Sequence, residues 1–339
     1  MKKNLLSVLI TGVLLLSIAA PNISAEKTSP EVSLYTKNIA DISSDTTINP
    51  IGKIVKYEEG KNVKPLIMEL TKSHNKTLNN EDYEARERRK DDYLSLIASG
   101  QEERFTEKFF DFLEENELVY YELGAPKKGQ ASILSTSASD VSLTTPFGTY
   151  DSVNKRYEIW GGFHFTNDNA WFDEAKNWLG IGNPTGNIGG VDTIGINLDG
   201  GTNGAALESF FMQPMYSDAP GNFNGGHGGD YSAPQVTNRV GNLSSNSGAM
   251  FLFQDKSVGF GLGNDGYAKY ANNFGRAAVK LAYSSAFANA SGNASTYYKH
   301  TWNKTTISGI TLNSDGSFSI SIANGNDSTE TLIGYDYAY

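Results

Sequence analysis

The fold is decided by the stretch Tyr157-Glu-Ile-Trp-Gly-Gly-Phe-His-Phe165. Every second residue from Tyr157 to Phe165 is apolar or glycine, and the residues between them form a second set that includes Glu158 and His164. Successive side chains of a strand point to opposite faces, so this period of two predicts a strand with two distinct faces. The preceding Phe147–Tyr150 is expected to pair with it across a turn at residues 151–155.

Similar patterns recur toward the C-terminus, where strands are expected at Asp192–Leu198, Ala249–Gln254, Ala277–Tyr283 and Thr331–Tyr339. The clearest hairpin has Ile310 and Leu312 before Asn313-Ser-Asp-Gly316, with Phe318, Ile320 and Ile322 after it. Short strands between Gly, Asn and Ser clusters predict a mainly β domain over residues 140–339, either an antiparallel sandwich or a barrel-like fold. The one helix expected there is Trp171–Leu179.

The region before this β domain has helical rather than strand periodicity. Helices are expected at Glu81–Ser99 and Gln101–Glu117, separated by Gly100. A small α-helical region therefore covers residues 61–123, and residues 26–60 are expected to form an extended or disordered lead-in.

The composition changes near residue 135. Residues 26–135 hold 16 Lys/Arg and 21 Asp/Glu, whereas the longer stretch 136–339 holds 10 and 17. Residues 124–139 combine Gly, Pro, two lysines and a Ser/Thr tract, which is typical of a linker. The helical region is either an ordinary domain or a prosegment removed by cleavage near Lys127 and Lys128, and the sequence leaves both open.

The first 25 residues predict export. Two lysines precede an uncharged, apolar run from Leu5 to Ala20, and Ile23-Ser-Ala25 offers a cleavage site. The run is shorter than the roughly 20 residues that span a bilayer, so a signal peptide at residues 1–25 is expected rather than a stable membrane anchor. A secreted, extracellular chain without a single cysteine favours a Gram-positive origin.

Charge and motifs argue against several classes of function. The net charge of −10 gives no electrostatic basis for binding nucleic acid. Gly261-Leu-Gly-Asn-Asp-Gly266 matches a dinucleotide motif in letters only, because no helix is expected after it, so it is interpreted as a turn cluster and no cofactor is expected. The Gly-x-Ser-x-Gly motif of α/β-hydrolases is absent from the sequence.

Three histidines of the β region are candidate site residues. His164 shares a strand face with Glu158 and Trp160, so it is either a general base or a half-buried structural residue. His227 and Asp230 lie in the glycine-rich loop Gly225–Asp230, which suits a polar ligand or is a plain surface loop. The remaining candidates are His300 and Trp302. None of the histidines has ligand spacing and thiolates are absent, so no metal site is expected.

Stretches of the β region resemble uncharacterised secreted proteins of Bacillus-type bacteria. They are Gly148–Gly162, Gly190–Gly195, Met250–Asp255 and Lys299–Ile307. The resemblance covers the C-terminal 200 residues, implies a secreted origin and carries no catalytic residue.

The leading hypothesis is a non-enzymatic protein that binds a surface, matrix or glycan ligand through exposed aromatic residues such as Trp160 and Trp302. The alternatives are a secreted hydrolase made as a zymogen and a β-rich membrane-damaging toxin. Carboxylates for glycoside hydrolysis are present, but the sequence selects no pair of them. The sequence also leaves the oligomeric state open.

Overall fold

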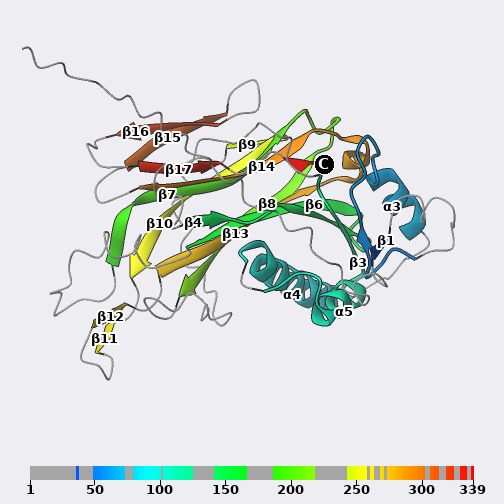
Figure 1. The fold of residues 1–339 in the computed structure, drawn as a ribbon, viewed down its shortest axis with the longest axis horizontal. Helices are drawn as coiled ribbons and strands as arrows, with labels where there is room; N and C mark the ends of the chain where they lie inside the picture. The colour runs from blue at the N-terminus through cyan, green and yellow to red at the C-terminus, as the bar shows by residue number, and fades with distance from the viewer. Residues whose placement is uncertain are drawn as a thin grey trace, which may run out of the picture.

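A computed structural model describes fourteen segments of the chain. They are residues 36–37, 49–72, 79–100, 102–124, 141–165, 186–217, 243–257, 260–262, 268–270, 273–301, 306–312, 318–323, 329–333 and 337–339. Two sheets lie face to face, with helices on the outer side of one sheet and a hairpin beside the other (Figure 1). The predicted mainly β domain with an additional helical region is confirmed, and its architecture is a sandwich.

The larger sheet, sheet A, joins both halves of the sequence. Its order is β1-β2-β3-β5-β6-β13-β8, and β4 also pairs with β6. The strands are β1 (Thr36–Lys37), β2 (Ile54–Val55), β3 (Leu118–Tyr121), β4 (Val141–Leu143), β5 (Phe147–Asp151), β6 (Arg156–Phe165), β8 (Leu207–Ser217) and β13 (Asn273–Tyr283). The first three strands pair in parallel, whereas β3 joins β5 antiparallel. The region before residue 124 is therefore built into the sheet of the β domain.

The second sheet, sheet B, has the order β17-β14-β7-β10-β9, with β18 also paired to β14. Its strands are β7 (Gly186–Asp199), β9 (Leu243–Ser245), β10 (Gly248–Ser257), β14 (Asn293–Thr301), β17 (Thr329–Ile333) and β18 (Tyr337–Ala338). The predicted final strand is thus two short strands that pair with the same neighbour.

Two further strand pairs stand apart from the main sheets. The predicted hairpin forms as β15 (Thr306–Leu312) and β16 (Phe318–Ala323), with Ile310 opposite Ile320 and Leu312 opposite Phe318. The pair β11 (Phe260–Leu262) and β12 (Ala268–Tyr270) flanks the predicted turn cluster at residues 261–266.

Three α-helices and one short 3-10 helix complete the described fold. They are α3 (Lys64–Thr71), α4 (Asn80–Ala98), α5 (Glu107–Glu115) and η1 (Ser285–Asn289). The predicted first helix is confirmed within one residue at either end. The second is shorter than predicted, because Phe105 has a positive φ of 70° and Thr106 caps the helix by accepting a hydrogen bond from the Phe109 amide.

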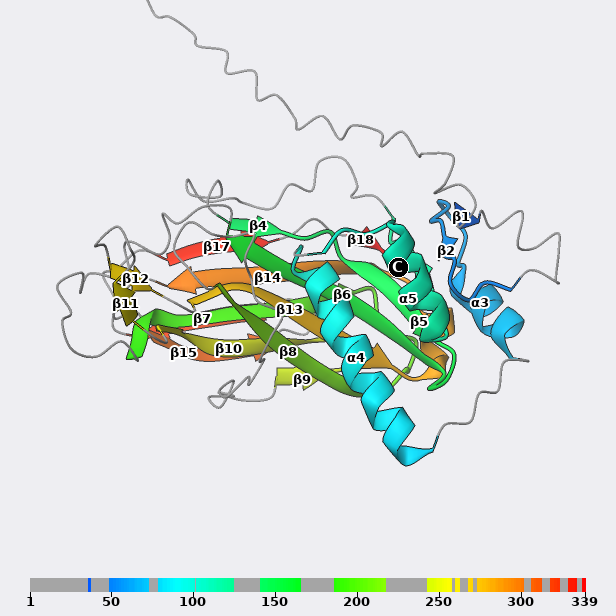
Figure 2. The same ribbon diagram turned by 90° about the horizontal axis from the view of Figure 1, so that it is seen from below.

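Strand β6 lies between two hydrophobic cores, and its central glycines show how closely it is packed. A Cβ on Gly161 would lie 2.4 Å from Thr296 Oγ1 of sheet B, and one on Gly162 would lie 2.5 Å from the carbonyl oxygen of Ala98 at the end of α4. Only glycine allows both approaches. Figure 2 shows α4 running across this outer face of sheet A.

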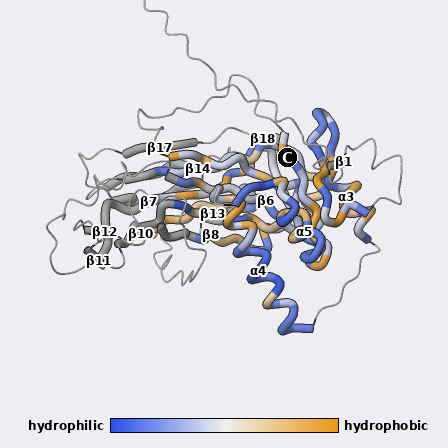
Figure 3. Tube along the Cα trace, turned by 60° about the horizontal axis from the view of Figure 1, so that its bottom comes forward, coloured by the Kyte–Doolittle hydropathy of each residue, from blue (hydrophilic) through white to orange (hydrophobic). Residues whose placement is uncertain are grey.

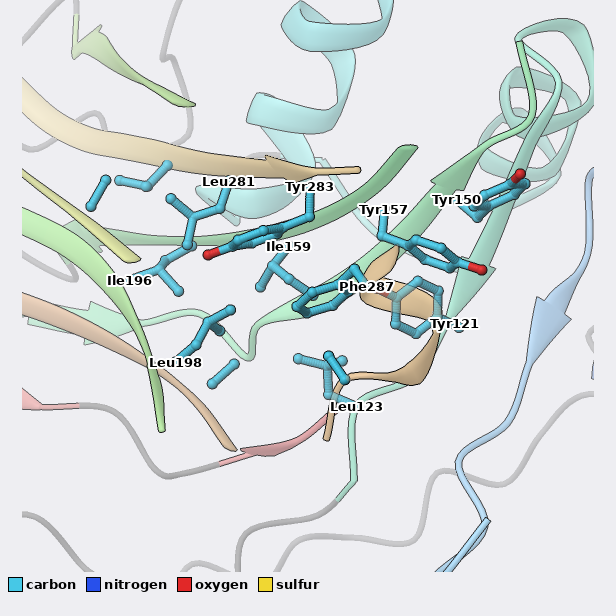
Figure 4. Close-up of a cluster of buried hydrophobic side chains, with 14 of the residues drawn as sticks. Tyr121, Leu123, Tyr150, Tyr157, Ile159, Ile196, Leu198, Leu281, Tyr283 and Phe287 are labelled. Carbon is cyan, nitrogen blue, oxygen red and sulfur yellow. The ribbon is translucent and has the colours of Figure 1, made fainter. Parts of the chain in front are cut away.

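The core between the sheets is rich in tyrosine and aliphatic side chains (Figure 4). Tyr157 packs at 4.7 Å from Tyr150, and Phe287 stacks on Tyr283 at 4.6 Å between ring centroids. The core beneath the helices joins Phe109, Leu113 and Trp160 among others. Both clusters draw residues from β6 and β13, so the helices share their strands with the sandwich.

Two predicted segments differ from or fall outside this description. Within the lead-in at residues 26–60, Ile51, Ile54 and Val55 are buried, so part of it belongs to the core. The predicted signal peptide, nearly all of the linker at residues 124–139 and the expected helix at Trp171–Leu179 lie outside the described residues. Among the helices of the described segments, none has both the length and the apolar character needed to cross a membrane.

Candidate functional site

The first cluster of charged side chains lies between α4 and sheet A. Arg86 forms a two-pronged pair with Asp151, with nitrogen to oxygen distances of 2.9 and 3.1 Å. Lys90 Nζ lies 2.7 Å from Asp151 Oδ2 and 2.7 Å from Glu158 Oε1. The cluster therefore ties one helix to the neighbouring strands β5 and β6.

The charges in this cluster hold one another ionised. Burial by itself raises the pKa of Glu158, but Lys90 and Lys280 outweigh it and hold the pKa below its ordinary value. Asp151 is likewise opposed by burial, and Lys90 and Arg86 hold its pKa well below its ordinary range. Glu158 is 1% exposed and Asp151 is fully buried, so a substrate cannot reach either carboxylate. These residues fasten α4 to the sheet.

Trp160, expected to be an exposed ligand-stacking residue, lies in the same buried layer. It has no exposed surface, and its indole lies parallel to the ring of Phe147 at 6.3 Å between centroids. Its Nε1 lies 3.3 Å from oxygens of Thr149 and Glu158. The expectation of a solvent-facing aromatic is wrong here, because α4 covers the face of β6 that carries this residue and side chains of α5 join the same core.

His164 lies on that face too, beside the end of α4. Burial and the nearby Arg276 lower its pKa to about 4, and they outweigh a contact with the backbone of Ser99 that acts in the opposite direction. A general base works best with a pKa near the operating pH, whereas burial and the neighbouring cation hold the pKa of this imidazole well below neutrality. The geometry fits the structural alternative.

For the other candidate residues from the sequence, the structure describes no side chain. His227, Asp230 and Trp302 lie outside the described residues. His300 belongs to β14, where its backbone pairs with Glu330 of β17, but its side chain is outside the description. Of the candidates whose side chains the structure describes, Glu158, Trp160 and His164 lie together on one strand face.

A second candidate is an open groove between α4 and α5, with a volume of about 520 Å³. We call it the helix groove; its lining residues are Tyr93, Glu107, Lys108, Asp111, Phe112 and Glu115. Tyr93 and Phe112 form its aromatic part, with ring centroids 4.1 Å apart and planes tilted by 39°. Both rings are partly exposed, and they offer an apolar surface to a ligand.

Carboxylates line the α5 side of the helix groove. Glu107, Asp111 and Glu115 are all exposed and follow one another at intervals of four residues, which places them on one helix face. Like charges at this spacing destabilise a helix by about 0.2–0.5 kcal/mol per pair. Figure 3 shows α4 drawn largely in hydrophilic colours, whereas α5 mixes hydrophilic and hydrophobic colours.

One cation already sits in the helix groove. Lys108 Nζ lies 5.2 Å from the centroid of the Tyr93 ring and pairs with Glu102 at 3.0 Å. The side chain of Lys108 is 64% exposed. An ammonium group therefore occupies the face of this ring, held by a side chain that solvent reaches.

A separate buried lysine joins the start of α3 to η1. Lys64 is 1% exposed, donates a hydrogen bond of 2.8 Å to the carbonyl oxygen of Ala290, and lies about 5 Å from the rings of Phe287 and Tyr339. Burial lowers its pKa to about 7. The contacts with the two rings favour the charged form and act against this shift.

The helix groove was not predicted from the sequence. Its acidic residues repeat as Glu107, Asp111 and Glu115, and this period was available in the sequence. The aromatic pair was not, because Tyr93 and Phe112 belong to different helices and meet only when both pack on sheet A.

No known family model matches the sequence, and a search of curated proteins finds no match. The resemblance to secreted proteins of Bacillus-type bacteria therefore stays a prediction.

Proposed function

We propose that the protein is a secreted, non-enzymatic binding protein that holds an extracellular glycan in the helix groove. The observation that carries this proposal is the partly exposed aromatic pair of Tyr93 and Phe112 in an open groove lined by polar groups. An aromatic ring suits the apolar face of a sugar, and carboxylates accept hydrogen bonds from the hydroxyl groups at its edge.

The volume and openness of the groove support a polymer rather than a small enclosed ligand. About 520 Å³ lies within the range of ligand sites. Because the groove is open to solvent, it can hold part of a ligand that extends beyond it, as a polysaccharide does.

The zymogen alternative has less support from the described residues. The two most central carboxylates, Asp151 and Glu158, are buried and paired with cations. Removing residues 26–135 would also remove β3, α4 and α5, and would uncover Trp160 and Phe147. Mass measurement of the protein from culture medium, combined with N-terminal sequencing, tests for this cleavage.

The binding proposal is tested by retention of the purified protein on insoluble peptidoglycan, chitin and cellulose. We expect retention on at least one of them and a reduction of about two- to tenfold for Tyr93→Ala, since one well-placed aromatic contact contributes about 0.5–1.5 kcal/mol. Tyr83→Ala is the matched control, because Tyr83 lies on the same helix but does not line the groove.

Two results would contradict the proposal. If the wild-type protein is retained on none of the three polymers, the proposal of glycan binding is rejected. Equal retention of wild type and Tyr93→Ala, with both folded by circular dichroism, removes the helix groove as its location.

A further inference from the structure

We infer that the glycan held in the helix groove is built of amino sugars, with free ammonium groups that pair with Glu107, Asp111 and Glu115. This inference rests on the proposed function and specifies its ligand class. It is argued from the charges of the groove and from the cation that the groove already contains.

The row of carboxylates matches a polymer with regularly repeated cations. Four residues of an α-helix rise by about 6 Å, so the three carboxylates follow one another at steps of that size. Among the described residues, no cation of the protein is recorded within ion-pair distance of Glu107, Asp111 or Glu115. Three carboxylates and one lysine line the groove, so its net charge is negative.

These carboxylates do not fit a metal site. A divalent cation needs several oxygen ligands converging on one point, and no group of three His, Cys, Asp or Glu residues in the described segments is close enough to hold one. A helical row spreads its charges along a line, which suits a linear polycation.

Lys108 shows how an ammonium group is accommodated beside the aromatic pair. Its Nζ lies 5.2 Å from the centroid of Tyr93, a cation–π distance. Because this side chain is 64% exposed, it can move away when a ligand arrives. Lys108 thus stands where the ammonium of an amino sugar would bind, and it competes with that ligand.

The pyranose ring distinguishes this ligand from a basic peptide. Tyr93 and Phe112 give the groove an apolar surface of two rings, which matches the flat face of a sugar beside its charged substituent. A lysine-rich peptide offers the charge with a flexible aliphatic stem and gains little from the rings.

The test compares two oligosaccharides of the same length and ring structure, a glucosamine hexamer and an N-acetylglucosamine hexamer. Binding is measured by calorimetry in weakly acidic buffer, where the free amines are protonated. We expect the glucosamine hexamer to bind at least tenfold more tightly, and this preference to fall as salt is added.

Four variants locate the effect. Glu115→Gln and Asp111→Asn are each expected to weaken binding of the glucosamine hexamer about two- to fivefold and to leave the acetylated hexamer unchanged. Glu84→Gln is the matched control, an exposed glutamate of α4 outside the groove. Lys108→Met removes the competing ammonium and is expected to tighten binding of the glucosamine hexamer, a gain that damage to the fold would not produce.

The outcomes separate this inference from the proposed function. Equal binding of the two hexamers would overturn the amino-sugar inference and leave the proposed glycan binding in place. If neither hexamer binds and the protein is also not retained on the insoluble polymers, the inference and the proposed function are both overturned. Displacement by an equal concentration of a lysine hexapeptide would show a general cation site and overturn the inference. Unchanged affinity in Glu115→Gln and Lys108→Met would overturn the assignment to this groove.

Discussion

Replacing Lys90 by methionine is expected to expose the energetic role of the buried charge cluster. Methionine keeps most of the length and the apolar stem of lysine, so the change removes a charge with little change in packed volume. What remains is Asp151, still paired with Arg86, and Glu158, whose nearest cation is then Lys280 Nζ at 3.9 Å. Removing one partner of a buried ion pair costs about 3–5 kcal/mol, and we expect a loss of unfolding free energy of that size at neutral pH.

The pH dependence of this loss gives a sharper test. In the wild-type protein the pKa of Glu158 is lowered, so its contribution to stability is present above about pH 4 and is lost as the pH falls below that. Without Lys90, burial is less opposed and we expect the pKa of Glu158 to rise above its ordinary value. A carboxyl group with a raised pKa takes up a proton in the folded state first, so the variant gains stability as the pH falls toward about 4. The difference in unfolding free energy between the wild-type protein and Lys90→Met should therefore narrow.

Urea unfolding followed by circular dichroism at about pH 7 and pH 5 measures both effects. Lys72→Met is the matched control, because Lys72 pairs with Glu69 on the surface and its side chain is 60% exposed, so a loss of less than about 1 kcal/mol is expected. Adding Glu158→Gln to Lys90→Met should restore part of the stability. A loss below about 1 kcal/mol for Lys90→Met, or an equal loss at both pH values, would refute the reasoning.

Three further predictions follow from other buried groups. Because burial and Arg276 lower the pKa of His164 to about 4, the free energy of unfolding should fall by roughly 2 kcal/mol as the pH falls from about 6.5 to 4. An NMR titration that gives His164 an ordinary pKa would contradict this. Because the pKa of Lys64 is lowered to about 7, the wild-type protein should gain stability as the pH rises from about 7 to 10.5. Lys64→Met should remove this gain and should be neutral or stabilising at pH 7. Urea unfolding at the two pH values measures both effects. A Cβ on Gly148 would lie 2.1 Å from the ring of Tyr121, so Gly148→Ala should lower the free energy of unfolding by about 1–3 kcal/mol. The variant should also be digested faster by a protease, because β3 and β5 pair at this position. An unchanged protease half-life would argue against this close packing.

Much of the fold was predictable, because short-range patterns carry it. The alternation in Tyr157–Phe165 predicted β6, and the hairpin around residues 310–322 followed from its apolar positions on either side of a turn. The parallel pairing of β2 with β3 was not predictable. Two-residue strands have no period to detect, and only the position of Ile54 and Val55 beside β3 gives them their role.

The charged helix shows why the buried cluster was missed. Arg86 and Lys90 stand four residues apart and continue to Leu94 and Ile97 on the same face. From the sequence alone such cations are expected to face water, because isolated charges are costly to bury. Their partners Asp151 and Glu158 come from strands some 60 residues away along the chain, and only the tertiary structure supplies them.

The sharing of β6 and β13 by both cores has a consequence for local opening. If α4 and α5 packed on a surface of their own, they could detach while the sandwich stayed intact, and their amide hydrogens would exchange with solvent well before those of the sheet. Here Trp160 and Ala278 belong to the core beneath the helices, while Ile159 and Val279, their neighbours in sequence, belong to the core between the sheets. Loss of either core therefore removes the support of the same two strands, and the central amides of β6 should exchange only when the whole domain opens.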